Sequence, residues 1–212
     1  MQEANKALLS HPLRKLFAPE SIAIIGASSS LERLTGRTLR YLQSFGYGGA
    51  IYPINPKADV ISGLPVHRNV TEVEGPVDLA ILSIKAKLIP DALRACADKK
   101  IPFALIYSSG FSETGDRALQ EEVSAIARDG GIRVLGPNCQ GLANLAEGIP
   151  LTFSGALYET PRPPAGHVAF VSQSGAFGFS SFGVGMEHGV RFRYVVTTGN
   201  QSDLDAVECA DY

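Results

Sequence analysis

Five short apolar runs, separated by segments with helical periodicity, constrain the fold of this chain more than any other feature. The runs are continuous rather than alternating, which is typical of strands buried on both faces of a parallel sheet. They cover residues 22–25, 50–54, 77–82, 103–107 and 132–135. The helical segments lie at about 38–45, 86–99 and 116–129. This order predicts an α/β unit with helices on both faces of a parallel sheet.

The pattern changes after the fifth run, where we expect a domain boundary. Residues 146–165 are rich in Gly and Pro and lack periodicity, which predicts a linker between a first domain (13–145) and a second (166–212). The sequence of the second domain predicts a strand, a helix, a second strand and a final helix that begins near Asp203 and is capped by Ser202. Two strands in so short a segment bury little core, so we expect the start of a larger domain.

Composition argues against several classes of function. The 212 residues include 19 basic and 21 acidic ones, a net charge of −2 with no long basic run, which argues against nucleic-acid binding. No apolar stretch reaches the roughly 18 residues of a membrane span, and the N-terminus lacks the apolar core of a signal peptide. Cys96, Cys139 and Cys209 are distant and odd in number, which argues against a disulfide framework or metal site and favours a reducing, cytoplasmic setting.

The carboxyl ends of all five expected strands are rich in small and polar residues. Ligands bind at this edge of an open parallel sheet, so we predict one shared site there. The candidates are Gly26, Ala27, Ser28, Ser29, Ser30, Lys57, Ser83, Ile84, Ser108, Ser109, Gly110, Asn138 and Cys139.

The first two of these loops indicate the class of ligand. Residues 26–30 lack the GxGxxG spacing of a dinucleotide fingerprint, but a small-residue loop before a helix still offers N–H groups to a phosphate. An NAD site has an acidic residue at the end of the second strand, where this chain has Asn55, Pro56 and Lys57. A lysine there attracts a phosphate on the ribose, which favours NADP or coenzyme A. A solvated surface lysine is the alternative.

A second candidate anion site precedes the helix of the second part. Ser172, Gln173, Ser174, Gly175 and Ala176 place hydroxyl and N–H groups at a helix N-terminus. A plain helix cap is the alternative. The G-x-S-x-G pattern of a nucleophile elbow is not matched, because Ser172 stands where the first glycine is required.

A series of segments in order resembles the NDP-forming acyl-CoA synthetases, which are relatives of the succinyl-CoA synthetase alpha subunit. The segments are PESIAIIGAS (19–28), IYPINPK (51–57), GLPV (63–66), VDLAI (77–81), SSGFSETG (108–115), LGPNCQG (135–141) and SQSGA (172–176). The resemblance runs from about residue 13 to 212. It implies a Rossmann-like CoA-binding domain followed by the start of a flavodoxin-like α/β domain of the succinyl-CoA synthetase type.

The resemblance also implies a function. These ligases make acyl-CoA from a carboxylic acid, CoA and ATP, with Mg²⁺, through an acyl phosphate and a phosphohistidine. It implies that the strand-end residues hold CoA, that the thioester forms near Asn138 and Cys139, and that residues 172–176 contact the phosphohistidine loop. The histidine and an ATP-grasp domain or subunit are expected beyond Tyr212, in a homo- or hetero-oligomer. We therefore expect no catalytic residue within these 212 residues and no activity from them alone.

Some residues depart from the family pattern. His167 and His188 match no phosphohistidine motif and are expected to be structural or at the surface. Cys139 has no adjacent general base, which favours a wall of the site over a nucleophile. Two other functions stay open: a CoA-sensing module of a GNAT-type protein lysine acetyltransferase, and an NADP- or nucleotide-binding regulator.

Overall fold

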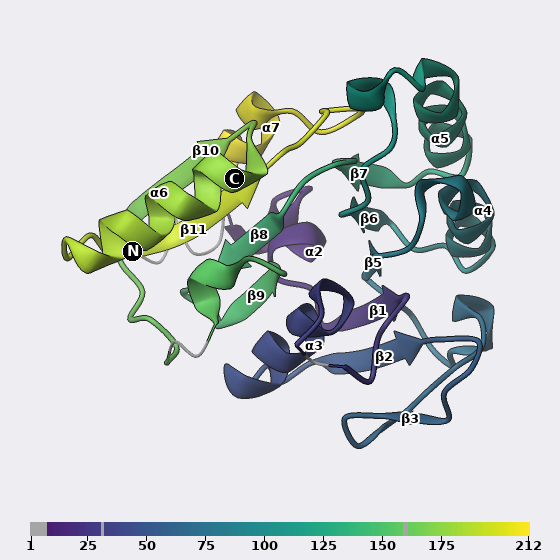
Figure 1. The fold of residues 1–212 in the computed structure, drawn as a ribbon, viewed down its shortest axis with the longest axis horizontal. Helices are drawn as coiled ribbons and strands as arrows, with labels where there is room; N and C mark the ends of the chain where they lie inside the picture. Colours follow the sequence, from purple (N-terminus) through teal and green to yellow (C-terminus); the bar gives the residue numbers. More distant parts are fainter. Residues whose placement is uncertain (1–7, 31, 159–160) are drawn as a thin grey trace.

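Five parallel strands form the first sheet of the molecule, in the order β2-β1-β5-β6-β7 (Figure 1). The computed structural model describes residues 8–30, 32–158 and 161–212. The strands are β1 (Ser21–Ile25), β2 (Ala50–Ile54), β5 (Leu79–Leu82), β6 (Phe103–Ile106) and β7 (Arg133–Leu135). Each strand coincides with one of the five apolar runs, so the predicted Rossmann-like parallel sheet is confirmed.

Alternate side chains of these strands enter two separate cores. Ile22 and Ile24 of β1 pack on one face, with α2 (Arg14–Phe17) and α3 (Leu34–Ser44). Ala23 and Ile25 pack on the other face, which α4 (Ile89–Asp98) and α5 (Arg117–Asp129) cover (Figure 1). Burial of both faces explains why the runs are apolar throughout rather than at every second residue.

Short elements connect the strands and helices of this unit. They are β3 (Val60–Ile61), β4 (Leu64–Pro65), η1 (Val70–Glu72), η2 (Ala86–Leu88) and η3 (Ser112–Thr114). The structure begins α3 at Leu34, whereas the sequence predicted a helix from residue 38. Among the described residues, no helix is both long and apolar enough to cross a membrane.

A second sheet, in the order β10-β11-β8-β9, lies beside the first (Figure 1). Its elements are β8 (Gly141–Asn144), β9 (Ile149–Thr152), η4 (Gly155–Leu157), β10 (Val168–Ser172), α6 (Gly175–Glu187), β11 (Phe192–Thr197) and α7 (Ala206–Asp211). β10 and β11 are parallel, whereas β8 runs antiparallel to both β11 and β9. The expected strand-helix-strand order of the second part is therefore present.

The segment 146–165, expected as a linker, contains strand β9. This strand is buried throughout and forms a hairpin with β8, which lies within the expected first domain but pairs into the second sheet. The close approach of the two strands requires Gly141, whose φ is +88°, because a β-carbon there would lie 2.1 Å from the carbonyl oxygen of Leu151. The division at 145 and 165 stays a prediction.

The final helix also differs from the expectation. Asp205, not Ser202, caps α7, and its carboxylate accepts hydrogen bonds from the N–H groups of Val207 and Glu208. The Ser202 hydroxyl instead donates to the carbonyl oxygen of Gly136, 3.1 Å away. Ser202 therefore joins the loop before α7 to the end of β7.

The two sheets are joined by a buried aromatic cluster. The ring of Phe17 stacks on Tyr212 with centroids 4.0 Å apart, and meets Tyr194 edge-on at 5.6 Å. The Asn144 amide donates to the carbonyl oxygen of Phe17 over 3.1 Å. Phe17 is 1% exposed, so α2 anchors the second sheet to the first.

We predict that Phe17→Ala lowers the free energy of unfolding by about 3–5 kcal/mol, because it removes a fully buried ring and leaves a cavity. Urea unfolding followed by circular dichroism measures the change. Leu9→Ala, at a side chain that is 65% exposed, is the control and should change stability by under about 0.5 kcal/mol. Equal losses in both variants would contradict the anchoring role of Phe17.

Candidate functional site

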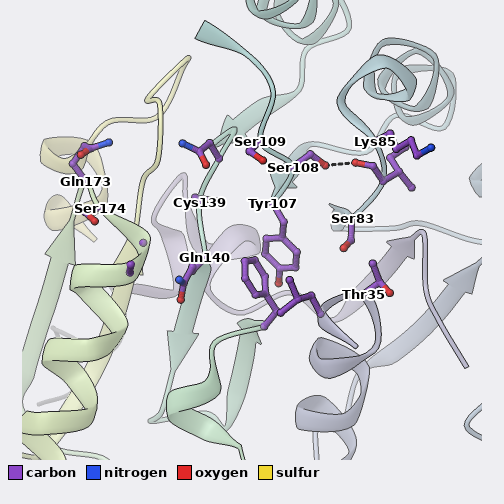
Figure 2. Close-up of a pocket in the computed structure, with 16 residues that line it drawn as sticks. Thr35, Ser83, Lys85, Tyr107, Ser108, Ser109, Cys139, Gln140, Gln173 and Ser174 are labelled. Atoms are coloured by element: carbon purple, nitrogen blue, oxygen red, sulfur yellow. Dashed lines mark hydrogen bonds between the residues drawn. The ribbon is translucent and has the colours of Figure 1, made fainter. Parts of the chain in front are cut away.

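A cleft of about 850 Å³ opens where the carboxyl ends of β5, β6 and β7 face the start of α6 (Figure 2). Ten of the residues named from the sequence line it: Ser83, Ile84, Ser108, Ser109, Asn138, Cys139, Gln173, Ser174, Gly175 and Ala176. Two segments far apart in the sequence, the strand ends and residues 173–176, thus meet in one cavity.

Two helix N-termini contribute to this cleft. Leu34 and Thr35 come from the start of α3, and Gly175 and Ala176 from the start of α6. The Ser174 hydroxyl caps α6 by accepting a hydrogen bond from the N–H of Phe177. N–H groups at a helix N-terminus favour an anion.

Glu113 holds the turn after β6 in place. Its carboxylate accepts hydrogen bonds from the N–H groups of Gly110 (2.6 Å) and Phe111 (3.2 Å), and from the side-chain amide of Asn200 (2.5 Å). Asn200 in turn accepts a hydrogen bond from the amide of Asn138, 3.2 Å away. One carboxylate thus ties the turn after β6 to the loop after β11, and through it to Asn138.

The thiol of Cys139 faces a buried environment. The residue is 2% exposed, and its sulfur donates weakly to the carbonyl oxygen of Ile106 at 3.4 Å. Burial raises the pKa of the Cys139 thiol to about 12, so it stays protonated at neutral pH. This environment fits a wall of the site. His167 and His188 are both exposed and do not line the cleft.

The remaining named residues do not line the cleft: Gly26, Ala27, Ser28, Ser29, Ser30, Lys57, Gly110 and Ser172. The first six lie at the ends of β1 and β2, the neighbouring strands of the same sheet edge. Gly26 has a φ of +89°, and a β-carbon there would lie 2.5 Å from the carbonyl oxygen of Ser83. The loop after β1 therefore packs directly against Ser83, the residue after β5 that lines the cleft.

Asn55 joins the two phosphate-binding candidates at this edge. Its amide donates to the carbonyl oxygen of Ala27 at 2.8 Å, and its side-chain oxygen accepts from the N–H of Lys57 at 2.8 Å. The exposed Lys57 thus follows a turn that is fixed to the first loop. The sequence placed Asn55 at a strand end but did not identify this positioning role.

Six lining residues were not among the predicted site residues: Leu34, Thr35, Lys85, Tyr107, Gln140 and Phe153. Tyr107 and Phe153 come from different sheets, and their rings meet edge-on at 4.9 Å. Gln140 lies within the LGPNCQG segment directly after Cys139, so its place in the sequence was a usable signal. The position of Phe153 depends on the packing of β9, for which the sequence carries no local signal.

Comparison with known proteins adds a family to this geometry. Residues 20–144 match the model of a CoA binding domain, and residues 165–212 match a succinyl-CoA ligase-like flavodoxin domain. The chain belongs to the CoA-binding domain family. The resemblance to NDP-forming acyl-CoA synthetases, and the fold class that it implied, are thereby confirmed.

Individual relatives agree with this family. An ADP-forming acetate–CoA ligase of Methanocaldococcus jannaschii is 34% identical over 202 residues, which are 95% of this chain and 28% of the relative. A trans-feruloyl-CoA synthase of an unknown prokaryotic organism is 36% identical over 190 residues, 89% of this chain and 27% of the relative. A solved acetyl-CoA synthetase of Ca. Korarchaeum cryptofilum superposes with a TM-score of 0.87 at 36% identity, over 94% of this chain and 42% of that one. The CoA-binding chain thus spans less than half the length of these relatives.

We predict that Glu113→Gln destabilises this CoA-binding chain at neutral pH by about 1 kcal/mol, because the carboxylate accepts charge-assisted hydrogen bonds at a partly solvated site. Burial by itself would raise the pKa of Glu113, but the hydrogen bonds from Asn200, Gly110 and Phe111 outweigh it and lower the pKa below 4.5. The stabilisation is therefore present above pH 4.5 and is lost as the pH falls through the lowered native pKa.

Urea unfolding between pH 3 and pH 7 measures this difference. The stabilities of wild type and Glu113→Gln should converge as the pH falls. Glu121→Gln, at an exposed position of α5, is the control and should track the wild type throughout. A constant gap between wild type and Glu113→Gln at every pH would refute the role of the ionised carboxylate.

Proposed function

We propose that this chain is the CoA-binding portion of an NDP-forming acyl-CoA synthetase, an enzyme that joins a carboxylic acid to CoA with ATP. The observation that carries the proposal is the cleft, where three strand ends and the N-termini of α3 and α6 converge in a CoA-binding family member. Its relatives bear the names of acid–CoA ligases. The family match favours CoA over NADP as the ligand.

CoA in this proposal extends along the sheet edge. Its adenosine and phosphate end lies against Gly26–Ser30 and Lys57, and its pantetheine arm passes Ser83, Ile84 and the 108–110 turn. The thiol then lies at Asn138 and Cys139, which face the start of α6 across the cleft. The parts of CoA are placed in the order of the strands: its adenosine end lies at β2 and β1, at one side of the sheet, and its thiol lies at β7, at the other side.

The reaction in this proposal follows from the thiol position. The CoA sulfur attacks the carbonyl carbon of an acyl phosphate, the C–O bond to phosphate breaks, and inorganic phosphate leaves. The N–H groups of Gly175 and Ala176 at the start of α6 stabilise the phosphoryl oxygens. The Korarchaeum relative has been solved in complex with phosphate and ADP.

The other components of the enzyme complete the proposal. ATP, Mg²⁺, the ATP-grasp part and the phosphohistidine belong to portions that these 212 residues do not include. We therefore propose that the chain acts in a cytoplasmic homo- or hetero-oligomer and has no ligase activity alone.

We predict that the chain binds CoA more tightly than NADP or NAD in isothermal titration calorimetry. Lys57 stands where an NAD site has a ribose-binding carboxylate, so a ligand with a phosphate on its ribose should bind more tightly than NAD. The match to a CoA binding domain favours CoA over NADP. Equal or tighter binding of NADP would overturn the assignment of the ligand.

We further predict that Lys57→Ala weakens CoA by about tenfold or more but leaves dephospho-CoA, which lacks the 3′-phosphate, nearly unchanged. A charge-assisted contact contributes about 1.5–3 kcal/mol. Raising the salt concentration should shrink the difference, because the exposed contact is screened. Titration of both ligands into both proteins at two salt concentrations is the measurement, and an equal loss for the two ligands would show that Lys57 does not bind the phosphate.

A further inference from the structure

A second groove, of about 480 Å³, adjoins the cleft and runs between α3, η4 and α6. It shares Leu34, Gln140, Phe153 and Ala176 with the cleft, so the two spaces are continuous. Gln140 follows Cys139 directly, at the end of the cleft where the proposed function places the thiol of CoA. The groove therefore begins where the acyl group of a thioester would project.

The groove is partly open to solvent and is lined by apolar side chains together with the polar Gln140, Ser154 and Ser180. Leu34 and Val184 are 54% and 55% exposed, unusual values for large aliphatic side chains, and both line it. The aromatic rings of Phe153 and Phe179 complete the apolar lining. Apolar side chains that face an open groove beside a ligand cleft are typical of a small-molecule subsite.

The charges of the groove distinguish between classes of acid. Among the described residues that line it, only Arg37 and Glu187 are charged, and they are of opposite sign. The Arg37 guanidinium is hydrogen-bonded to the carbonyl oxygens of Glu32 (3.2 Å) and Phe153 (3.5 Å). The groove thus offers no net positive charge to a second carboxylate, and a two-carbon acyl group would leave most of its volume to water.

We infer that this groove is the acyl subsite of the proposed CoA site and takes the side chain of a bulky, largely apolar acid, such as an aryl or branched acid. The inference rests on the proposed function, because the position of the thiol sets where the acyl group enters. It goes beyond that function in naming the substrate class and the residues that select it.

Gly183 on α6 offers a way to fill the groove without disturbing the fold. A β-carbon added there would meet only the β-carbon of Ala156 on the facing wall, at 3.8 Å, which is ordinary van der Waals contact. Leucine is also a better helix former than glycine. Gly183→Leu therefore narrows the groove while α6 and the CoA cleft keep their structure.

The test compares the affinities of CoA, acetyl-CoA and benzoyl-CoA for the chain by calorimetry. In the wild type, benzoyl-CoA should bind about tenfold more tightly than acetyl-CoA, because burying a ring removes apolar surface from water. Gly183→Leu should abolish that gain and leave CoA within about twofold. Gly48→Leu is the matched control: it adds the same side chain where nothing lies within 4 Å, and should retain the gain.

A second variant keeps the test decisive if Gly183→Leu fails to fold. Val184→Asn places a polar group on an exposed wall position, and should reduce the benzoyl-CoA gain several-fold without affecting CoA. Equal binding of acetyl-CoA and benzoyl-CoA by a wild type that binds CoA would overturn the acyl subsite alone. Failure of the wild type to bind CoA at all would overturn the proposed function, and the subsite with it.

Discussion

The buried hydroxyl of Thr38 on α3 fixes the relation between the two sheets, and the cleft depends on that relation. Thr38 donates to the carbonyl oxygen of Thr152 at 3.0 Å, and its oxygen lies 3.1 Å from the hydroxyl of Tyr107. Burial raises the pKa of Tyr107, so its hydroxyl remains protonated and available to Thr38 as a donor. Because Tyr107 directly follows β6 of the first sheet and Thr152 ends β9 of the second, one side chain on α3 connects both. The same contact places Tyr107 against Phe153, and these two rings form a wall of the cleft.

The groups that the proposed CoA site offers to an anion are backbone N–H groups more than charged side chains. Among the described residues that line it, Lys85 alone carries a charge, and its side chain is exposed. The start of α6 instead contributes N–H groups at a position that the Ser174 cap defines. Backbone donors are fixed by the helix and lose little freedom on binding, whereas a lysine must be ordered. This distribution explains how a chain of net charge −2 can present a site for a polyanionic ligand.

The sequence was sufficient for the parts of the molecule whose signal is local. Residues 22–25 of β1 are all apolar because both faces of the strand are buried, and this run is visible in the sequence alone. The parallel topology then brings the ends of β5, β6 and β7 to one edge. Strand β9 contains Pro150 and is held by pairing with β8 and by the close approach at Gly141, contacts that no local pattern reveals. Ser83 and Ser108 were predicted as part of the site because they follow strands with a local signal. Phe153 was not predicted, because it follows β9, which has no such signal.

The five residues between β7 and β8 connect the two sheets and are hydrogen-bonded to both units, which explains why the candidate site lies at their junction. Within this connection, the N–H of Asn138 donates to the carbonyl oxygen of Ser108 in the first unit (2.9 Å). The N–H of Gln140 donates to the hydroxyl of Thr197 on β11 in the second (3.0 Å). Asn138, with a φ of +56°, and Gln140 are therefore positioned by opposite sides of the cleft. The connection between β7 and β8 therefore takes its position from both sheets, and Asn138, Cys139 and Gln140 line the cleft where the first sheet faces the start of α6.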